Sequence, residues 1–214
     1  GTNLIYSTYY GGMGNENPHS IVCNNAGELY VFGSTSSLDL PTSALTYDNN
    51  FNGGTNVQNG VLNYVDGTDA YVAKFNPSGT SLIGGTYVGG SGNDALNADL
   101  LKKNYGDEFR GEIIVDANDN CWVATTTSSI DFPVVNPLQA TNGGNYDAIL
   151  FKFNSNLSGL LWSSYYGGTN ADAAYSIQLN SLNQPIITGG TLSSDLTMSS
   201  GQNTSSFGGV DGFI

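Results

Sequence analysis

A short apolar pattern that ends in two glycines occurs three times along the chain. Residues 4–12 read LIYSTYYGG, residues 82–90 read LIGGTYVGG and residues 160–168 read LLWSSYYGG. Aromatic and β-branched residues before a glycine pair predict a strand that ends in a tight turn. The closing glycines Gly12, Gly90 and Gly168 are evenly spaced along the sequence. Such regular recurrence predicts an array built from one repeated unit.

Two further blocks recur in the same order. Residues 21–35, 113–127 and 177–191 each contain two apolar runs around an Asn/Asp/Gly cluster, which predicts a β-hairpin. The block DAYVAKFN at 69–76 returns as DAILFKFN at 147–154 and begins again at 211–214, and it predicts another strand. Each full unit therefore contains four strands in an antiparallel meander, which is the make-up of a β-propeller blade.

Composition agrees with an all-β fold. The chain has 214 residues, of which 39% are hydrophobic, so it is long enough to bury a large core. Only 11% of the residues are charged and 29 are glycine, a balance that disfavours long surface helices and favours short strands with tight turns. Because one repeat runs through the sequence, we expect one domain over residues 1–214.

The net charge excludes two classes of partner. The formal charge is −13, with only five basic residues, so phosphate backbones and anionic membrane surfaces would be repelled. No apolar run approaches the roughly 18 residues needed to span a bilayer. We expect no nucleic-acid partner and no membrane insertion.

The succession D-A-Y-V-A-K-F-N, P-S-G-T, Y-V-G-G-S-G-N-D and G-S-T-S-S-x-D-x-P resembles the SBBP β-propeller repeat of secreted bacterial proteins. This resemblance covers nearly the whole chain and implies a fold and a setting rather than a reaction, because the family has no universal catalytic residues. It implies an extracellular or cell-surface location. It also implies a link to gliding-related surface proteins and to cargo of the type IX secretion machinery of the Bacteroidota.

The resemblance also sets the phase of the units. It implies an orphan outer strand at 1–12, blade one at 19–90, blade two at 111–168 and an incomplete blade three at 175–214. About three blades cannot close a ring, for which four to eight are needed. We expect a section of a larger propeller, with an oligomeric ring as the alternative.

Two units carry an insertion, and the two insertions are equal in length. The connection from the glycine pair to the next hairpin spans residues 90–113 in unit two but only 12–21 in unit one. The connection from the proline to the third-block strand spans residues 41–69 in unit one but only 133–147 in unit two. In an up-and-down meander these two connections lie on the same side. Variable loops on a repeated scaffold are the usual place for recognition.

The insertions supply the candidate partner-binding residues. The unit-two insertion concentrates three of the five basic residues beside acids and a tyrosine, which suits a carboxylate-bearing glycan or an acidic protein patch. The unit-one insertion is rich in Asn, Gly and aromatic residues, which can stack on sugars and bind hydroxyls. A solvated loop and a flexible hairpin are the plainer alternatives. The candidates are Lys102, Lys103, Tyr105, Asp107, Glu108, Arg110, Tyr47, Phe51, Asn56 and Tyr64.

Catalytic and metal sites have weaker support. Nine of the 18 acids recur in register, which indicates a structural role in turns. Residues 116–127 begin like a calcium loop but have Cys121 and Thr127 where Gly and Glu are required, so we expect no cofactor, with calcium as a remote alternative. His19 is the only histidine, so neither a Ser-His triad nor a zinc cluster is expected. Cys23 and Cys121 fall at different positions of different units, which favours free thiols over a disulfide.

We expect a non-enzymatic binding or adhesion scaffold that recognises a glycan or a protein at the cell surface. The alternative is a polysaccharide-active enzyme, a glycosidase or lyase, with its site at the central opening. Asp107, Glu108 and Glu112 lie outside the repeat register and are the carboxylates such an enzyme would use.

Overall fold

The computed structural model describes residues 2–59, 62–97, 99–103 and 106–214. The fold is all-β, as predicted, and the described residues contain no α-helix. The first sheet has the spatial order β1 (Glu16–Cys23), β2 (Leu29–Thr35), β5 (Asp69–Phe75) and β6 (Leu82–Val88). The second has β7 (Glu112–Val115), β8 (Cys121–Thr127), β9 (Asp147–Phe153) and β10 (Leu160–Tyr166).

The third sheet contains β11 (Asp172–Leu179), β12 (Pro185–Thr191) and β13 (Asp211–Phe213). A separate hairpin of β3 (Val57–Asn59) and β4 (Leu62–Tyr64) belongs to the unit-one insertion. Two short 3-10 helices, η1 (Asp99–Leu101) and η2 (Asp107–Phe109), belong to the unit-two insertion. All sheet pairings are antiparallel, so each unit is a meander.

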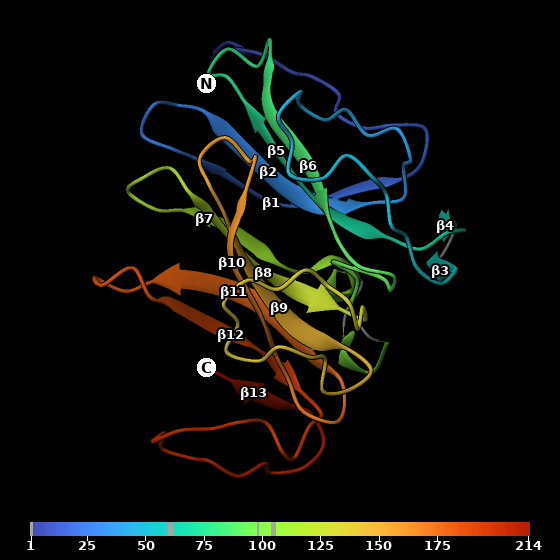
Figure 1. Cartoon of the computed structure of the whole chain (residues 1–214), viewed down its shortest axis with the longest axis vertical. Coiled ribbons are helices and arrows are strands. Elements are labelled where there is room, and N and C mark those ends of the chain that lie inside the picture. The colour runs from blue at the N-terminus through green and yellow to red at the C-terminus, as the bar shows by residue number, and fades with distance from the viewer. Residues whose placement is uncertain (1, 60–61, 98, 104–105) are drawn as a thin grey trace.

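The three sheets are stacked face to face, and their first strands lie side by side (Figure 1). The first strand of the middle sheet, β7, contacts both β1 and β11. One apolar core fills the space between the first two sheets and includes Phe32, Val72, Val123 and Phe151. A second core lies between the last two sheets and includes Trp122, Leu150 and Ile177. Each inner sheet surface is therefore covered by its neighbour.

The outer strand predicted at 1–12 is wrong for the described residues 2–12, which form no strand. A strand needs a neighbouring edge to hydrogen-bond with. These residues instead lie against the outer face of the first sheet, where the Tyr10 ring packs on Tyr71 and Phe75. Most of the segment is exposed, including Leu4, Ile5 and Tyr9.

The first strands of units one and three begin earlier than predicted and are interrupted by a β-bulge. The register shifts between Pro18 and Ser20 in β1 and between Ala174 and Ser176 in β11, so His19 and Tyr175 are the extra residues. A bulge bends the strand and redirects one side chain. In unit two, Asp94 still pairs with Thr127, and regular pairing resumes at Glu112. The unit-two insertion thus emerges at the bulge position inside the first strand, rather than in the preceding turn.

The unit-one insertion has two parts with different surroundings. Its first part follows the outer edge of β6, where Ser43 donates its backbone N–H to Gly85 and Tyr87 donates to Asp48. The corresponding loop of unit two follows β10 in the same way, because Val135 and Ser163 exchange backbone hydrogen bonds. These segments cover sheet edges that would otherwise expose unpaired backbone groups. Only the part around β3 and β4 projects from the sheet.

Repeated carboxylates fix the turns that join one unit to the next. Each accepts the backbone N–H of the second glycine of its Gly-Gly pair, and the pairs are Glu16 with Gly12, Asp94 with Gly90 and Asp172 with Gly168. A hydroxyl of the following strand pair also donates to each carboxylate, from Ser37, Ser129 and Ser193 respectively. The structural role predicted for these acids is confirmed.

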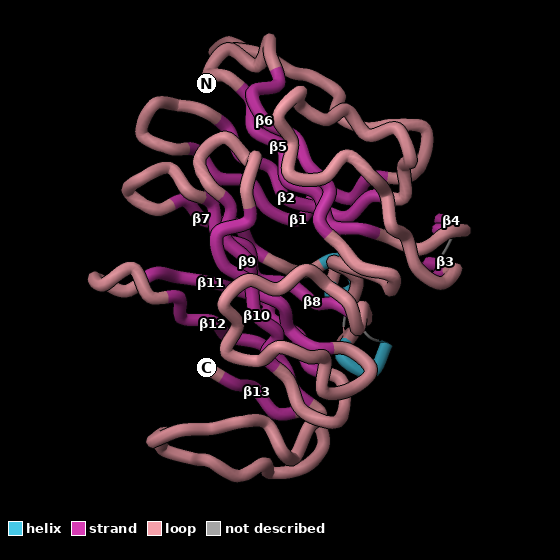
Figure 2. The backbone as a smooth tube through the Cα atoms, in the orientation of Figure 1, coloured by secondary structure: helices cyan, strands magenta, loops and turns pink. Residues whose placement is uncertain are grey.

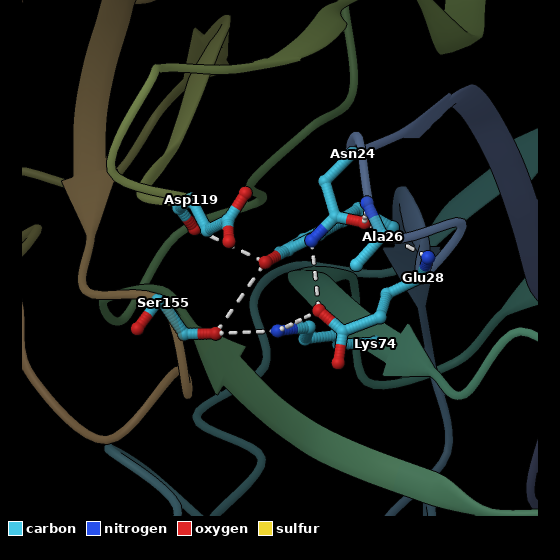
Figure 3. A network of polar contacts seen from close by, with 7 residues as sticks. Asn24, Ala26, Glu28, Lys74, Asp119 and Ser155 are labelled. Carbon is cyan, nitrogen blue, oxygen red and sulfur yellow. Dashed lines mark hydrogen bonds and ion pairs between the residues drawn. The ribbon is translucent and has the colours of Figure 1, made fainter.

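The hairpin turns on the other side of the stack are tied together by lysine (Figure 3). Lys74 forms an ion pair of 2.7 Å with Glu28 and donates to the Ser155 carbonyl of the next unit at 3.0 Å. Lys152 occupies the equivalent position and pairs with Asp116 at 2.9 Å.

The Asp116 carboxylate also accepts the backbone N–H groups of Asn118 and Asn120. In unit one, the Asn24 side-chain oxygen accepts the N–H groups of Ala26 and Glu28 in the same way. Asp116 is therefore engaged in an ordinary hairpin turn.

Both cysteines are free, Cys23 exposed and Cys121 buried. Among the described residues, no helix has the length and apolar character needed to cross a membrane.

Candidate functional site

The two insertions meet on one side of the molecule, opposite the β1–β2, β7–β8 and β11–β12 turns (Figure 1). The helical turns of the unit-two insertion lie on the same side as β3 and β4 (Figure 2). The ring of Tyr64, from the unit-one insertion, lies 6.0 Å from the ring of Phe109, from the unit-two insertion. We call this surface the insertion face, defined by the described residues of 53–66 and 95–111 together with His19 and Tyr175.

The unit-two insertion is held together by ion pairs between its own residues. Lys102 Nζ lies 2.6 Å from Glu108 Oε1, and Arg110 Nη1 lies 3.0 Å from Asp107 Oδ1. Asp107 also accepts the backbone N–H of Lys103 at 2.7 Å. Both carboxylates are buried, whereas the Arg110 side chain is 44% exposed. The acids of the insertion thus form ion pairs with two of its cations, Lys102 and Arg110.

Arg110 is the most exposed of the four ion-paired side chains. Its guanidinium lies over the Tyr175 ring, 4.4 Å from the ring centroid. Stacking and the bond to Asp107 fix the plane of the guanidinium, which presents the remaining donors in a defined direction. The Tyr175 hydroxyl lies 3.5 Å from the Asn97 amide nitrogen, which also donates to the Asp107 carbonyl at 3.1 Å.

His19 lies under the point where the insertions meet. Its ring lies 5.0 Å from Phe32 and 5.8 Å from Phe109, and Nε2 lies 3.3 Å from the Ser34 hydroxyl. Burial lowers the pKa of His19 to about 3, so the ring is neutral at physiological pH. Its Nδ1 is buried without a hydrogen-bond partner in the described part of the chain.

The remaining candidates of the unit-one insertion separate into two groups. Tyr64 is buried, and its hydroxyl accepts a hydrogen bond from Asn17. Asn56 is exposed on the insertion face and donates to Asn63 at 3.0 Å. Tyr47 and Phe51 lie elsewhere, since Tyr47 packs on Phe153 in the core between the first two sheets.

Phe51 stacks 6.3 Å from Tyr87 and packs against the outer core of the first sheet. Both aromatics therefore serve the scaffold, because the first part of their loop runs along β6. Lys103 is exposed at the insertion face. Tyr105 lies outside the residues that the structure describes.

Sequence reasoning missed three residues of this face, Asn97, Phe109 and Tyr175. A signal for Tyr175 was available, because His19 and Tyr175 hold equivalent positions where unit two has Gly111. Their side chains differ from unit to unit, unlike the residues that build the sheets. The bulge that redirects them could not be read from single-strand periodicity.

The chemistry of the insertion face favours binding. The half-buried ring of Phe109, the side-chain amides and one stacked guanidinium can make flat contacts and directed hydrogen bonds to a polar ligand. Glu112, the third carboxylate outside the repeat register, accepts hydrogen bonds from the Ser176 hydroxyl and the Ile177 N–H. Within the described ranges, no three His, Cys, Asp or Glu side chains gather in a way that would hold a metal ion.

No protein-family model matches the chain, and no curated protein matches it with significant similarity.

Proposed function

We propose that the chain is a section of an extracellular β-propeller that binds a glycan through the insertion face without turning it over. The observation that carries this proposal is the meeting of the two insertions at Tyr64 and Phe109. The repeated carboxylates and lysines form bonds within the fold, whereas the unit-two insertion and the β3–β4 part of the unit-one insertion meet at one place. Recognition on a repeated scaffold belongs to such non-repeated parts.

The arrangement of the sheets supports the propeller. The first strands β1, β7 and β11 lie next to one another, and the fourth strands β6 and β10 lie farthest from them in each meander. Neighbouring propeller blades have this arrangement, in which each four-stranded sheet packs face to face on the next. The chain would then present the insertion face along the rim of a central opening. The extracellular setting follows from the SBBP resemblance.

The residues of the insertion face support a glycan as the ligand. A glycan offers hydroxyls for the Asn amides and an apolar ring face for aromatic side chains. The Arg110 guanidinium is oriented by Tyr175 and Asp107 and keeps further N–H donors, which favours a glycan that carries a carboxylate. Binding without turnover is proposed because Asp107, Glu108 and Glu112 are each occupied by bonds within the protein.

A panel of neutral and carboxylate-bearing oligosaccharides tests the proposal. The chain should retain one or more of them and return them unshortened after prolonged incubation. Arg110→Ala should weaken binding of a carboxylate-bearing glycan by about tenfold or more, because a charge-assisted hydrogen bond is worth about 1.5–3 kcal/mol. Arg110→Lys should recover only part of the affinity, since Lys keeps the charge but not the planar donors.

Asn203→Ala is the matched control, because Asn203 is an exposed amide in the loop before β13. It should leave binding unchanged. Cleavage of any glycan, with loss of cleavage on Glu108→Gln, would support the enzyme instead. Binding only to proteins would replace the glycan as ligand.

A further inference from the structure

The β1–β2 turn brings an amine, a carboxylate and a carboxamide together (Figure 3). Lys74 Nζ lies 2.7 Å from Glu28 Oε2, and Asn24 Nδ2 donates to the same oxygen at 2.8 Å. Lys74 belongs to β5, whereas Asn24 and Glu28 belong to the turn. One carboxylate oxygen of Glu28 therefore bonds both to the amine of a lysine and to the nitrogen of a side-chain amide.

The carbonyl of the same amide is polarised by the backbone of the turn. Asn24 Oδ1 accepts the N–H of Ala26 at 3.1 Å and the N–H of Glu28 at 2.9 Å. Two backbone donors at such distances stabilise the negative charge that develops on a carbonyl oxygen when a nucleophile attacks its carbon. The Asn24 amide thus has donors on its oxygen and an acid–base group on its nitrogen.

Lys74 is held in a buried position beside these groups. The residue is 5% exposed, and its Nζ lies 5.0 Å from the centroid of the Tyr30 ring. Burial lowers the pKa of Lys74, but its bonds to Glu28 and Tyr30 outweigh burial and raise that pKa above its usual value. The amine is therefore protonated at neutral pH and becomes a nucleophile only when a base takes a proton from it. Glu28 is in direct contact and is the group that can do so.

The equivalent turns of the other units divide these groups differently. In unit two, Asp116 stands at the position of Asn24, so the backbone N–H groups of the turn bond to a carboxylate, and Lys152 pairs with that carboxylate. In unit three, Asn180 donates to Gln184, which stands at the position of Glu28. Of the three described turns, the unit-one turn alone combines a lysine, a separate acid and an amide with a polarised carbonyl.

We propose that Lys74 and Asn24 become joined by an intramolecular isopeptide bond, with Glu28 as the acid–base catalyst. Glu28 accepts a proton from the Lys74 ammonium, and the freed Nζ attacks Asn24 Cγ, so that negative charge develops on Oδ1. Glu28 passes its proton to Nδ2, and the bond between Cγ and Nδ2 breaks. The linked Nζ gives its second surplus proton, through Glu28, to the departing ammonia, which leaves as ammonium. No oxidant or cofactor takes part.

The link is compatible with the fold and constrains it. Asn24 Oδ1 remains a carbonyl oxygen and keeps both backbone hydrogen bonds, so the turn is retained. The new bond closes a covalent ring over residues 24–74, which includes β2 and the unit-one insertion. A closed ring reduces the conformational entropy of the unfolded chain, so the linked protein unfolds at a higher urea concentration than the unlinked one.

The intact mass of the chain after prolonged incubation at neutral pH is the first test, and it should fall by one molecule of ammonia. Trypsin then locates the link, because a succinimide at an Asn–Gly pair such as Asn52–Gly53 also loses ammonia. Trypsin recognises the lysine cation, which an amide bond removes. Cleavage after Lys74 should be lost, so that residues 1–102 remain in one peptide. Cleavage after Lys152 should continue and serves as the internal control.

Two substitutions reproduce turns that already fold in the other units. Glu28→Gln gives the Asn–Gln pair of unit three, and Asn24→Asp gives the aspartate of unit two. Both variants should keep the mass that their sequence gives and should be cut after Lys74. The full sequence mass of the unaltered chain, with cleavage after both lysines, would overturn the proposal. So would a link that survives in Glu28→Gln, or a loss of cleavage that is equal at Lys74 and Lys152.

Discussion

At the scale of single residues, buried carboxylates dominate the electrostatics of the stack. Asp69, Asp94 and Asp147 are fully buried, and burial raises their pKa values to about 8, 7 and 6. Each carboxylate accepts hydrogen bonds that oppose this shift, such as those from Thr127 and Gly90 to Asp94, but desolvation is the larger effect. Neighbouring carboxylates add to it, since Asp94 raises the pKa of Asp69 and Asp172 raises that of Asp147.

These shifts predict that stability falls as pH rises. In the unfolded chain an aspartate titrates near pH 4, so between that pH and the folded-state pKa the folded protein binds more protons than the unfolded one. The stabilisation is fully present below about pH 4 and is lost as pH rises through about 6 to 8. The melting temperature should therefore be higher at pH 5 than at pH 8.5. Asp147→Asn should reduce this difference, and a melting temperature that rises over the same range would contradict the proton uptake.

The repeated tyrosine provides a second test at this scale. Tyr87→Phe or Tyr165→Phe removes a hydroxyl that bridges a buried carbonyl and a buried N–H. Leaving both groups unpaired should lower the free energy of unfolding by about 1–3 kcal/mol, measured by urea denaturation. Tyr9→Phe should have almost no effect, because the Tyr9 side chain is fully exposed. Equal effects at the three positions would mean that the buried hydroxyls are not structural.

At the scale of strands and loops, the sequence predicted the repeated strands and hairpins correctly. Its predictions were wrong for segments that differ from the repeated unit. Hairpins and third strands were predicted because alternating apolar residues and turn residues act locally. Residues 4–12 were predicted as a strand from the same pattern, but a strand requires a hydrogen-bonded neighbour, which local pattern cannot supply. Tyr47 and Phe51 were assigned to a binding loop because sequence alone did not show that their segment follows β6.

The bulge explains where an insertion is tolerated. The bulge residue is unpaired in β1 and β11, so extra residues at this point break no pairing on either side. Deleting residues 97–110 would join Leu96 to Gly111 and restore the spacing of unit one. The shortened chain should keep its β circular dichroism and its exchange-protected strands. It should lose about 3 kcal/mol of stability, because Leu101 and Phe109 no longer bury apolar surface.

Loss of cooperative folding in the shortened chain would contradict this account of the bulge. It would mean that the insertion is needed for the pairing of Asp94 with Thr127, and is not merely tolerated at an unpaired position of the first strand.

At the scale of the whole molecule, one repeated interface between neighbouring sheets accounts for the stack. The same arrangement places both insertions on one side, where they contact each other through Tyr64 and Phe109. The sequence predicted this side correctly from the meander, but it could not show that the basic residues pair with Asp107 and Glu108. Those pairs form because folding of the insertion brings Lys102 to Glu108 and Arg110 to Asp107.

The most direct test of the central claim compares the intact chain with the chain that lacks residues 97–110 on the same panel of oligosaccharides. The intact chain should retain a glycan and leave it unshortened, and the shortened chain, shown by circular dichroism to be folded, should retain none. Equal retention by both chains, or shortening of the glycan by the intact chain, would contradict a binding site at the insertion face.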